Sequence, residues 1–156
     1  MGEYIQELRK VVGHRPLLQV GASVLIEDSQ GRLLLEKRKD TNNWAHIGGA
    51  VELFEEVETT AKREVLEETG LILDDLQFFA IFSGEKFRFV YPNQDEVSNI
   101  DIVFLCKSYH GTLQPQTSEV TELRFFELQE LPDQLFAPSI PVLEAWKKHH
   151  CLNKSG

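Results

Sequence analysis

The stretch over residues 49–71 reads GAVELFEEVETTAKREVLEETGL. It predicts a helix over residues 55–69, because apolar residues recur there at the spacing that lines one face of an α-helix. The residues of this face are Val57, Ala61 and Val65. Gly70 follows where a glycine typically ends a helix. The segment is therefore expected to pack on a core through its apolar face.

Three glutamates of the same helix stand at positions i, i+3 and i+4, namely Glu64, Glu67 and Glu68. Glu64 and Glu68 fall on or beside the apolar face, and Glu67 lies on its flank. Like charges at this spacing repel each other, a helix C-terminus disfavours anions, and carboxylates beside an apolar face lose water. A magnesium ion, which prefers oxygen ligands, would relieve these costs. The helix alone leaves open a solvated acidic face paired with Arg63 and Lys62.

Composition narrows the class of protein. A chain of 156 residues can bury a core, and we expect residues 1–156 to form one domain. The net charge of -9 argues against a broad nucleic-acid surface. It allows one nucleotide to enter a cleft where a bound cation offsets its phosphate charge.

No apolar run approaches the roughly 20 residues of a membrane span, and the opening MGEYIQELRK is not typical of a signal peptide. These features predict a cytoplasmic protein. Cys106 lies in an apolar run and Cys151 lies near the tail, so neither a disulfide nor a zinc site is expected.

Elements on both sides of the central helix predict a mixed sheet. Patterns of apolar residues and turn residues place strands and helices around it. The expected strands cover residues 17–27, 32–38, 76–83, 86–91, 100–109 and 122–128, and further helices cover residues 3–10 and 138–150. This order indicates an α/β or α+β sandwich.

The spacing around the helix resembles the Nudix box, Gly-x5-Glu-x7-Arg-Glu-U-x-Glu-Glu-x-Gly-U, in which U is aliphatic. Its positions are filled from Gly49 through Glu55 and Arg63 to Leu71. The resemblance extends over about residues 17–150 and leaves the N-terminal helix outside. It implies an α/β/α sandwich with a central mixed sheet, and a magnesium-dependent hydrolase that splits a diphosphate linkage of a nucleotide-like substrate, with manganese as a substitute metal.

The resemblance also implies roles for the residues of the box. Glu64, Glu67 and Glu68 would bind metal, and Gly49 would allow close backbone approach or supply a carbonyl ligand. Arg63 would orient a box glutamate, either Glu55 or Glu67. Glu52 matches a carboxylate common in the loop of this family. For the general base, Glu64 is the first candidate and Glu119 the second, against a solvated loop position for Glu119.

Phe54 departs from the usual pattern, because relatives commonly have glycine before the first box glutamate. A bulky side chain disfavours the positive φ that glycine allows. The hypothesis is that Phe54 either contacts the substrate base or strains the loop.

The other substrate candidates each have a structural alternative. Arg38, or its neighbour Lys37, could meet phosphates or could simply be exposed at a strand end. His46 could bind substrate or be structural. Four aromatic residues could stack on a base or pack in a core or a subunit interface, namely Trp44, Phe87, Phe89 and Tyr91.

Three functions remain open at this point. The first is a diphosphate hydrolase, acting on a nucleoside triphosphate, ADP-ribose or a nucleotide sugar, with capped RNA least favoured by the acidic charge. The second is a Nudix-like sensor that binds a nucleotide with weakened turnover, and the third is a structural protein solubilised by an acidic helix. A homodimer is common among relatives.

Overall fold

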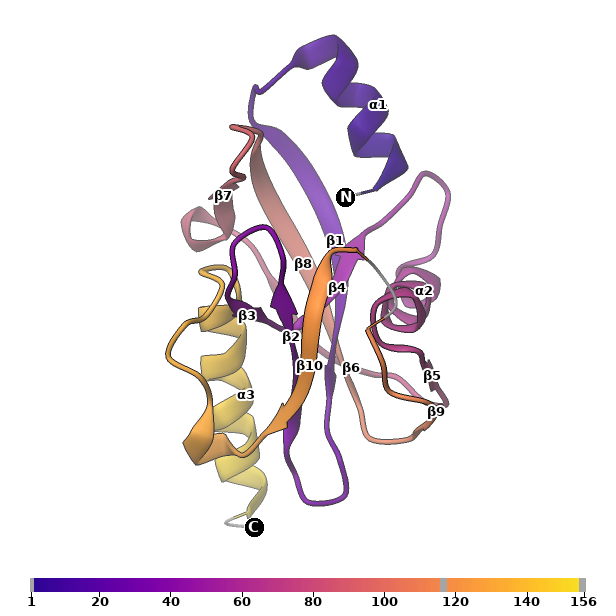
Figure 1. Cartoon of the computed structure of the whole chain (residues 1–156), viewed down its shortest axis with the longest axis vertical. Helices are drawn as coiled ribbons and strands as arrows, with labels where there is room; N and C mark the ends of the chain where they lie inside the picture. The colour runs from indigo at the N-terminus through magenta and orange to yellow at the C-terminus, as the bar shows by residue number, and fades with distance from the viewer. Residues whose placement is uncertain (1, 116–117, 155–156) are drawn as a thin grey trace.

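Two helices cover opposite sides of a set of β-strands in the computed structural model, which describes residues 2–115 and 118–154. Helix α2 (Val57–Thr69) lies on one side and helix α3 (Ser139–Lys154) on the other (Figure 1). The predicted sandwich with a central mixed sheet is confirmed. Within the described ranges, no helix is long and apolar enough to cross a membrane.

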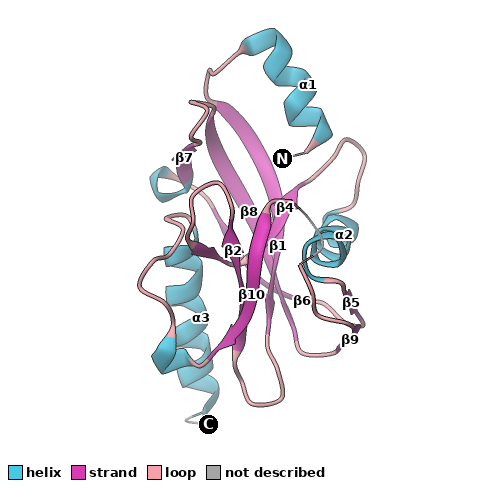
Figure 2. Ribbon diagram, viewed as in Figure 1, coloured by secondary structure: helices cyan, strands magenta, loops and turns pink. Residues whose placement is uncertain are grey.

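The largest sheet among the described residues has the strand order β4-β1-β8-β6, with β7 also paired to β8 (Figure 2). Strands β1 and β8 run parallel, and the other pairs of this sheet are antiparallel. Its strands are β1 (Leu17–Ile26), β4 (Ile47–Ala50), β6 (Gln77–Phe82), β7 (Arg88–Val90) and β8 (Glu96–Cys106). Since both directions occur, the sheet is mixed.

Two smaller sheets complete the strands of the described chain. One has the order β10-β2-β3 and the other pairs β5 with β9. Their strands are β2 (Leu33–Arg38), β3 (Trp44–Ala45), β5 (Leu71–Leu73), β9 (Tyr109–Gly111) and β10 (Val120–Phe126). Short 3-10 helices, η1 (Glu85–Phe87) and η2 (Leu128–Glu130), join some of these elements.

Several predicted boundaries were wrong. Helix α2 begins at Val57 and not at the predicted residue 55, because Glu56 is its N-cap residue and has an extended backbone. Glu55 lies before the helix, where its carboxylate accepts hydrogen bonds from Thr60 and Arg63. The strand predicted over residues 86–91 is shortened by the 3-10 turn η1. Strand β8 begins at Glu96, before the predicted start at residue 100, because its first residues pair with β7.

Alternating side chains of the strands divide the core into two layers. Val24 and Leu34 pack with Ala61 and Val65 of α2, which confirms the predicted apolar face of this helix. The intervening residues of the strands, such as Leu25, pack towards α3. Gly70 has φ 80° and donates its N–H to the Leu66 carbonyl, so it ends α2 as predicted. Cys106 is buried in the first layer, Cys151 is exposed on α3, and both are free cysteines.

Helix α1 (Glu3–Val12) lies apart from the sandwich but is joined to it by buried contacts. Ile5 is 2% exposed. The Arg9 guanidinium, with only 9% of its side chain exposed, donates a hydrogen bond to the carbonyl of Glu96 and lies 3.7 Å from the Asp95 carboxylate. The C-terminal half of α1 is thereby fixed to the turn between β7 and β8.

Arg9→Ala is expected to lower the free energy of unfolding by about 1.5–3 kcal/mol, the range for hydrogen bonds of a charged group. Urea unfolding followed by circular dichroism measures the loss. Lys10→Ala is the matched control, because Lys10 is 70% exposed and forms an ion pair with Glu7 of the same helix, so its replacement should cost less than about 0.5 kcal/mol. Equal losses in the two variants would show that Arg9 does not anchor α1.

Candidate active site

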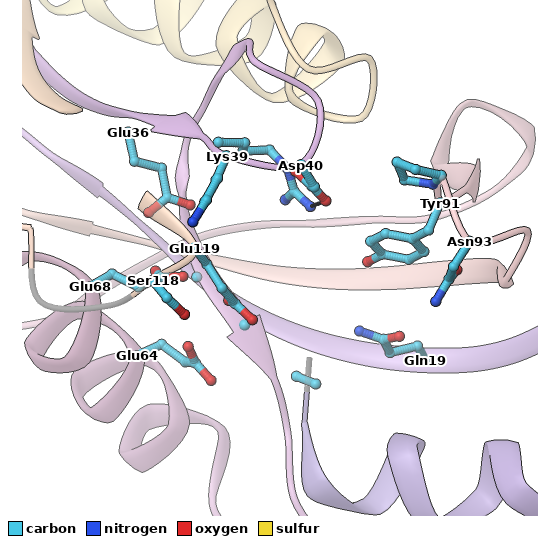
Figure 3. A pocket seen from close by; sticks show the side chains of 15 residues that line it. Gln19, Glu36, Lys39, Asp40, Glu64, Glu68, Tyr91, Asn93, Ser118 and Glu119 are labelled. Atoms are coloured by element: carbon cyan, nitrogen blue, oxygen red, sulfur yellow. Dashed lines mark hydrogen bonds and ion pairs between the residues drawn. The ribbon is translucent and has the colours of Figure 1, made fainter. Parts of the chain in front are cut away.

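A cavity of about 480 Å³ lies between α2, the end of β2 and the loop before β10. Four glutamates gather at one end of it, which we call the acidic end (Figure 3). Glu64 and Glu68 come from α2, Glu36 comes from β2, and Glu119 precedes β10. The Glu119 carbonyl accepts a hydrogen bond from the Lys39 N–H at 2.9 Å, which fixes the backbone of this loop. Helix, strand and loop thus bring carboxylates to one place.

Glu36 and Glu68 are almost completely buried, at 4% and 6% exposure. One oxygen of each carboxylate, Oε2, is buried without a hydrogen-bond partner. Burial raises the pKa of Glu36 to about 8. Burial also raises the pKa of Glu68 well above its ordinary value, and the nearby charge of Glu36 adds to this. Buried carboxylate oxygens with no partner are ligands that a hard cation would satisfy.

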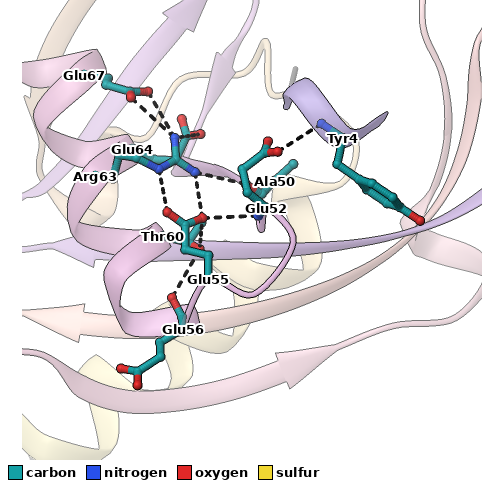
Figure 4. A network of polar contacts seen from close by, with 9 residues as sticks. All are labelled: Tyr4, Ala50, Glu52, Glu55, Glu56, Thr60, Arg63, Glu64 and Glu67. Atoms are coloured by element: carbon teal, nitrogen blue, oxygen red, sulfur yellow. Dashed lines mark hydrogen bonds and ion pairs between the residues drawn. The ribbon is translucent and has the colours of Figure 1, made fainter. Parts of the chain in front are cut away.

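Arg63 holds the other side of the acidic end together (Figure 4). Its guanidinium contacts both oxygens of Glu55 at 2.8 and 3.0 Å, Glu64 at 3.0 Å and Glu67 at 3.3 Å. The sequence left Glu55 and Glu67 open as its partner, and Arg63 contacts both, with the shorter bonds to Glu55. These bonds lower the pKa of Glu55 to about 2 and raise that of Arg63.

As the side chains lie, no group of three acidic, histidine or cysteine side chains in the described ranges is arranged to hold a metal ion. Glu67 is exposed on the flank of α2 and turned to Arg63, whereas Glu64 and Glu68 face inward. Burial also raises the pKa of Glu64. The residues present fit a cation by their chemistry and by the two partnerless oxygens, not by a preformed coordination shell.

Gly49 lies directly against the acidic end. A Cβ atom added at this residue would come within 2.1 Å of the Glu64 carboxyl carbon. A side chain at this position would force the Glu64 carboxylate to move, so the glycine allows Glu64 to pack on the backbone of β4. A second hollow, of about 440 Å³, shares Glu64, Glu68 and Glu119 with the first.

A protein-family model described as NUDIX domain matches residues 17–146, which include all of these glutamates. The chain belongs to the Nudix family. It is 32% identical to an oxidized purine nucleoside triphosphate hydrolase of Danio rerio, over 70% of this chain and 68% of the relative. It is 33% identical to an ADP-ribose pyrophosphatase of Methanocaldococcus jannaschii, over 71% of this chain and 63% of the relative.

Solved structures agree with this assignment. A MutT NUDIX hydrolase from Burkholderia pseudomallei superimposes with a TM-score of 0.70 at 27% identity, over 84% of this chain and 98% of that one. The protein is a Nudix hydrolase, a pyrophosphohydrolase of a family that generally depends on a divalent metal. Helix α1 lies outside the matched Nudix residues.

Two predicted substrate residues of this Nudix enzyme lie at its cavities. Arg38 lines the large cavity, where it forms an ion pair with Asp40 at 2.7 Å and stacks over the Phe136 ring at 4.1 Å. Glu52 lines the second hollow, and its carboxylate accepts the Tyr4 N–H at 3.0 Å, at the N-terminus of α1 (Figure 4). A helix N-terminus favours such an anion.

Phe54, the third predicted substrate residue, lines neither of these cavities. Its side chain is fully exposed, at 102%, and its φ is 66°. The backbone has the left-handed conformation that favours glycine, and Phe54 adopts it with strain. Of the two hypotheses for Phe54, the geometry favours loop strain over contact with a substrate base.

Phe54→Gly is expected to raise the free energy of unfolding by about 1 kcal/mol, because the left-handed conformation costs a residue with a side chain about 1–2 kcal/mol. KM should stay unchanged. Denaturant unfolding measures the free energy of unfolding, and steady-state kinetics measure KM. The control is Leu53→Gly, at an exposed neighbour without a positive φ, which should lower stability. A rise in KM for Phe54→Gly would restore the contact hypothesis.

Most of the aromatic candidates and His46 have structural roles. Trp44 and Phe87 are buried in the core layer towards α3. His46 bridges Ser139 at 2.7 Å and Asp101 at 2.8 Å, which joins the start of α3 to β8. Tyr91 alone among the four aromatic candidates lines the large cavity.

Sequence reasoning missed Glu36 and Gln19. A glutamate between Leu35 and Lys37 looks like a solvent-facing strand residue. Side chains alternate between the two faces of a strand, however, so Glu36 shares the face of Leu34, two residues earlier, and this pattern could have indicated that Glu36 is buried. Gln19 sits on β1, and its cavity position depends on neighbours far along the chain.

Proposed function

We propose that this Nudix hydrolase splits the diphosphate linkage of a nucleoside diphosphate derivative with magnesium, or manganese in its place. The observation that carries the proposal is the pair of buried, partnerless carboxylate oxygens on Glu36 and Glu68, beside Glu64 in a cavity large enough for a nucleotide. Relatives with similar identity act on oxidized purine nucleoside triphosphates and on ADP-ribose, so the class of substrate is supported and the individual substrate is not.

The metal ligands that we propose are Glu64, Glu67 and Glu68, with Glu36 added on geometric grounds and the Gly49 backbone beside them. Bound magnesium supplies positive charge to the diphosphate oxygens and acidifies the attacking water. Glu67 would have to exchange its contact with Arg63 for the metal. Arg63 is a positioning residue, because its strongest bonds hold Glu55 and the loop of the box.

Glu64 is our first candidate for the general base. Burial raises its pKa above the usual range for a glutamate, and a base works best when its pKa approaches the working pH. Glu119 is the second candidate, since it borders both hollows. We propose that Arg38 meets substrate phosphates. The Glu52 carboxylate already accepts a hydrogen bond from the N-terminus of α1. We therefore propose that Glu52 holds the loop of the Nudix box and does not bind substrate.

The experiment is a screen of nucleoside triphosphates, dinucleoside polyphosphates, ADP-ribose and nucleotide sugars with magnesium or manganese. Products are separated as phosphate, pyrophosphate and nucleoside monophosphate. Hydrolysis that ceases with a chelator is expected. Tight nucleotide binding without any hydrolysis would instead identify a sensor, the alternative that the strained loop at Phe54 favours. The single domain over residues 1–156, the cytoplasmic location and a homodimer remain predictions.

A further inference from the structure

Helix α1 contacts two separate segments that border the active site (Figure 1). The first is the loop between β4 and α2, residues 51–56, which we call the box loop. The second is the turn between β7 and β8, residues 91–95, which we call the β7–β8 turn. The matched Nudix residues begin at residue 17, so both contacts come from outside the Nudix domain. A helix with two such contacts fixes one segment relative to the other.

The N-terminus of α1 is capped by the box loop. Gly2, its own N-cap residue, makes no side-chain capping bond. The Glu52 carboxylate, 48 residues away from Tyr4, accepts the Tyr4 N–H at 3.0 Å instead. The first N–H groups of a helix have no partner within the helix, and they favour an anion. The box loop and α1 therefore hold each other through this bond, which we call the N-terminal tie.

The box loop connects this bond to the acidic end (Figure 4). The Glu52 N–H donates to the Glu55 carboxylate at 3.2 Å, and the Glu55 N–H donates to the Glu52 carbonyl at 3.1 Å. Arg63 donates to Glu55 at 2.8 Å and to Glu64 at 3.0 Å. A continuous set of hydrogen bonds thus joins the N-terminus of α1 to a carboxylate of the acidic end.

The other end of α1 is fixed through Arg9. Its guanidinium donates to the carbonyls of Gly13 at 2.9 Å and Arg15 at 2.6 Å, and also to the Glu96 carbonyl at the start of β8. It lies 3.7 Å from the Asp95 carboxylate, whose side chain is only 10% exposed. Removing one partner of a buried charge pair is costly. Arg9 therefore binds α1 to the β7–β8 turn, and we call this contact the C-terminal tie.

The β7–β8 turn forms part of the wall of the large cavity. Tyr91 and Asn93 line this cavity (Figure 3). The Tyr91 N–H donates to the Asp95 carbonyl at 2.8 Å, and the Asn93 amide donates to the Asp95 carboxylate at 3.1 Å. The same carboxylate bonds to His14, just after α1, at 2.7 Å. Asp95 thus joins the C-terminal tie to the cavity wall.

We infer that α1 is a strap that holds the box loop and the β7–β8 turn in the positions that hydrolysis needs. Neither Tyr4 nor Arg9 lines the large cavity or the second hollow. Both therefore act through other residues, and Arg9 is a positioning residue. A helix outside the Nudix domain thus controls the geometry of the site inside it. The inference rests on the proposed function for what the cavity binds.

The two ties are expected to affect different kinetic constants. The N-terminal tie leads to the acidic end, where metal and diphosphate are proposed to bind, so its loss should lower kcat. The C-terminal tie leads to the cavity wall, so its loss should raise KM, because a loosened turn has to be ordered again when the nucleotide binds. A general loss of stability would not divide in this way.

Tyr4→Pro tests the N-terminal tie. Proline is tolerated in the first turn of a helix and lacks the N–H that Glu52 accepts. With the nucleotide that the screen shows to be hydrolysed fastest, kcat should fall roughly 5- to 100-fold, because small displacements of catalytic groups are costly. Tyr4→Ala is the matched control, since it removes the same side chain but keeps the N–H, and it should retain the wild-type kcat. Equal kcat values in these two variants would overturn the inference.

Arg9→Ala tests the C-terminal tie. It should raise KM roughly 3- to 10-fold with little change in kcat, because the turn loses its preorganisation. Arg9→Lys keeps a cation beside Asp95 and should recover part of the increase. Lys10→Ala, at the exposed neighbouring residue, is the control and should keep the wild-type KM. If the KM of Arg9→Ala equalled that of Lys10→Ala, the inference would be wrong.

Amide hydrogen exchange of the metal-free protein tests the strap without any substrate. Arg9→Ala should speed exchange of the Tyr91 N–H, and Tyr4→Pro that of the Glu55 N–H, by roughly 10-fold more than exchange at Val103. Val103 of β8 is fully buried, so its exchange reports the stability of the whole fold. An equal rise at all three amides would show that the variants only weaken the fold, which contradicts a strap.

Failure of the proposed function would be visible separately, as a wild-type protein that hydrolyses no nucleotide in the screen. Hydrogen exchange would then still decide about the strap, because local release of the loop and the turn supports it and unchanged exchange overturns it. Turnover by the wild type with unchanged kcat and KM in Tyr4→Pro and Arg9→Ala would support the hydrolase and overturn the strap.

Discussion

Glu68→Gln is expected to lower metal-dependent hydrolysis by roughly 10²- to 10³-fold, the effect of removing one preorganised electrostatic group from an active site. Glu68 is buried at the acidic end, and one of its oxygens has no hydrogen-bond partner in the protein, so this oxygen is free to bind a cation. The fold should persist, because glutamine has nearly the same shape and removes a buried charge next to Glu36. Steady-state kinetics and a thermal melt measure the two effects.

Glu58→Gln provides the matched control, since Glu58 is an exposed glutamate in the first turn of the same helix. It should leave hydrolysis unchanged. If Glu68→Gln kept full activity while remaining folded, the acidic end would not be the metal site. A Glu68→Gln variant that lost activity only because it unfolded would show a lowered melting temperature, and Glu64→Gln, at a less buried residue, would then decide.

The metal-free protein is expected to lose stability as the pH rises from 4.5 through about 8. In the unfolded chain Glu36 releases its proton near its ordinary pKa, whereas in the folded protein it keeps the proton to about pH 8. Between these values the folded state binds more protons, so its stability is full at low pH and declines as the pH rises. Glu68 shifts in the same direction. A loss of about 1–3 kcal/mol corresponds to burying an unsatisfied polar group.

Chelator-treated protein, unfolded with denaturant across a pH series, measures this decline. Magnesium binds the deprotonated carboxylates, so it should restore more stability at pH 8 than at pH 5. Glu36→Gln should flatten the pH dependence. The pKa of Glu55 is lowered to about 2, so its contribution to stability changes with pH in the opposite direction. This contribution is lost only as the pH falls below the ordinary pKa of a glutamate, outside the pH range of the Glu36 effect. If the stability of the metal-free protein rose towards pH 8, the raised pKa values of Glu36 and Glu68 would be contradicted.

The central helix and its carboxylates could be predicted because their evidence is local. The repeat of Val57, Ala61 and Val65 fixed the buried face, and the same wheel placed Glu68 inward and Glu67 on the flank, as the burial confirms. Gly70 marked the end of the helix without any tertiary information.

The remaining parts of the site depend on contacts between distant segments. Glu36 reaches the acidic end only because β2 packs against α2. Alternation in LLLEKR places Glu36 on the same face as Leu34, but it does not show what that face meets. Strands β5 and β9 were missed because each has three residues and they pair across a long stretch of chain. The strain at Phe54 was anticipated because a single departure from the family pattern was visible in the sequence, but its full exposure was not.

The N-terminal helix has a practical consequence for anyone who purifies this protein. Gly2 borders the hollow beside Glu64, and even one added carbon at Gly2 would come within 2.2 Å of a Glu52 oxygen. A side chain introduced at Gly2, for example to attach a fluorescent label, would therefore press on the Glu52 carboxylate that accepts the Tyr4 N–H. Helix α3 ends at the opposite extremity of the molecule, which makes the C-terminal side the safer place for a label (Figure 1).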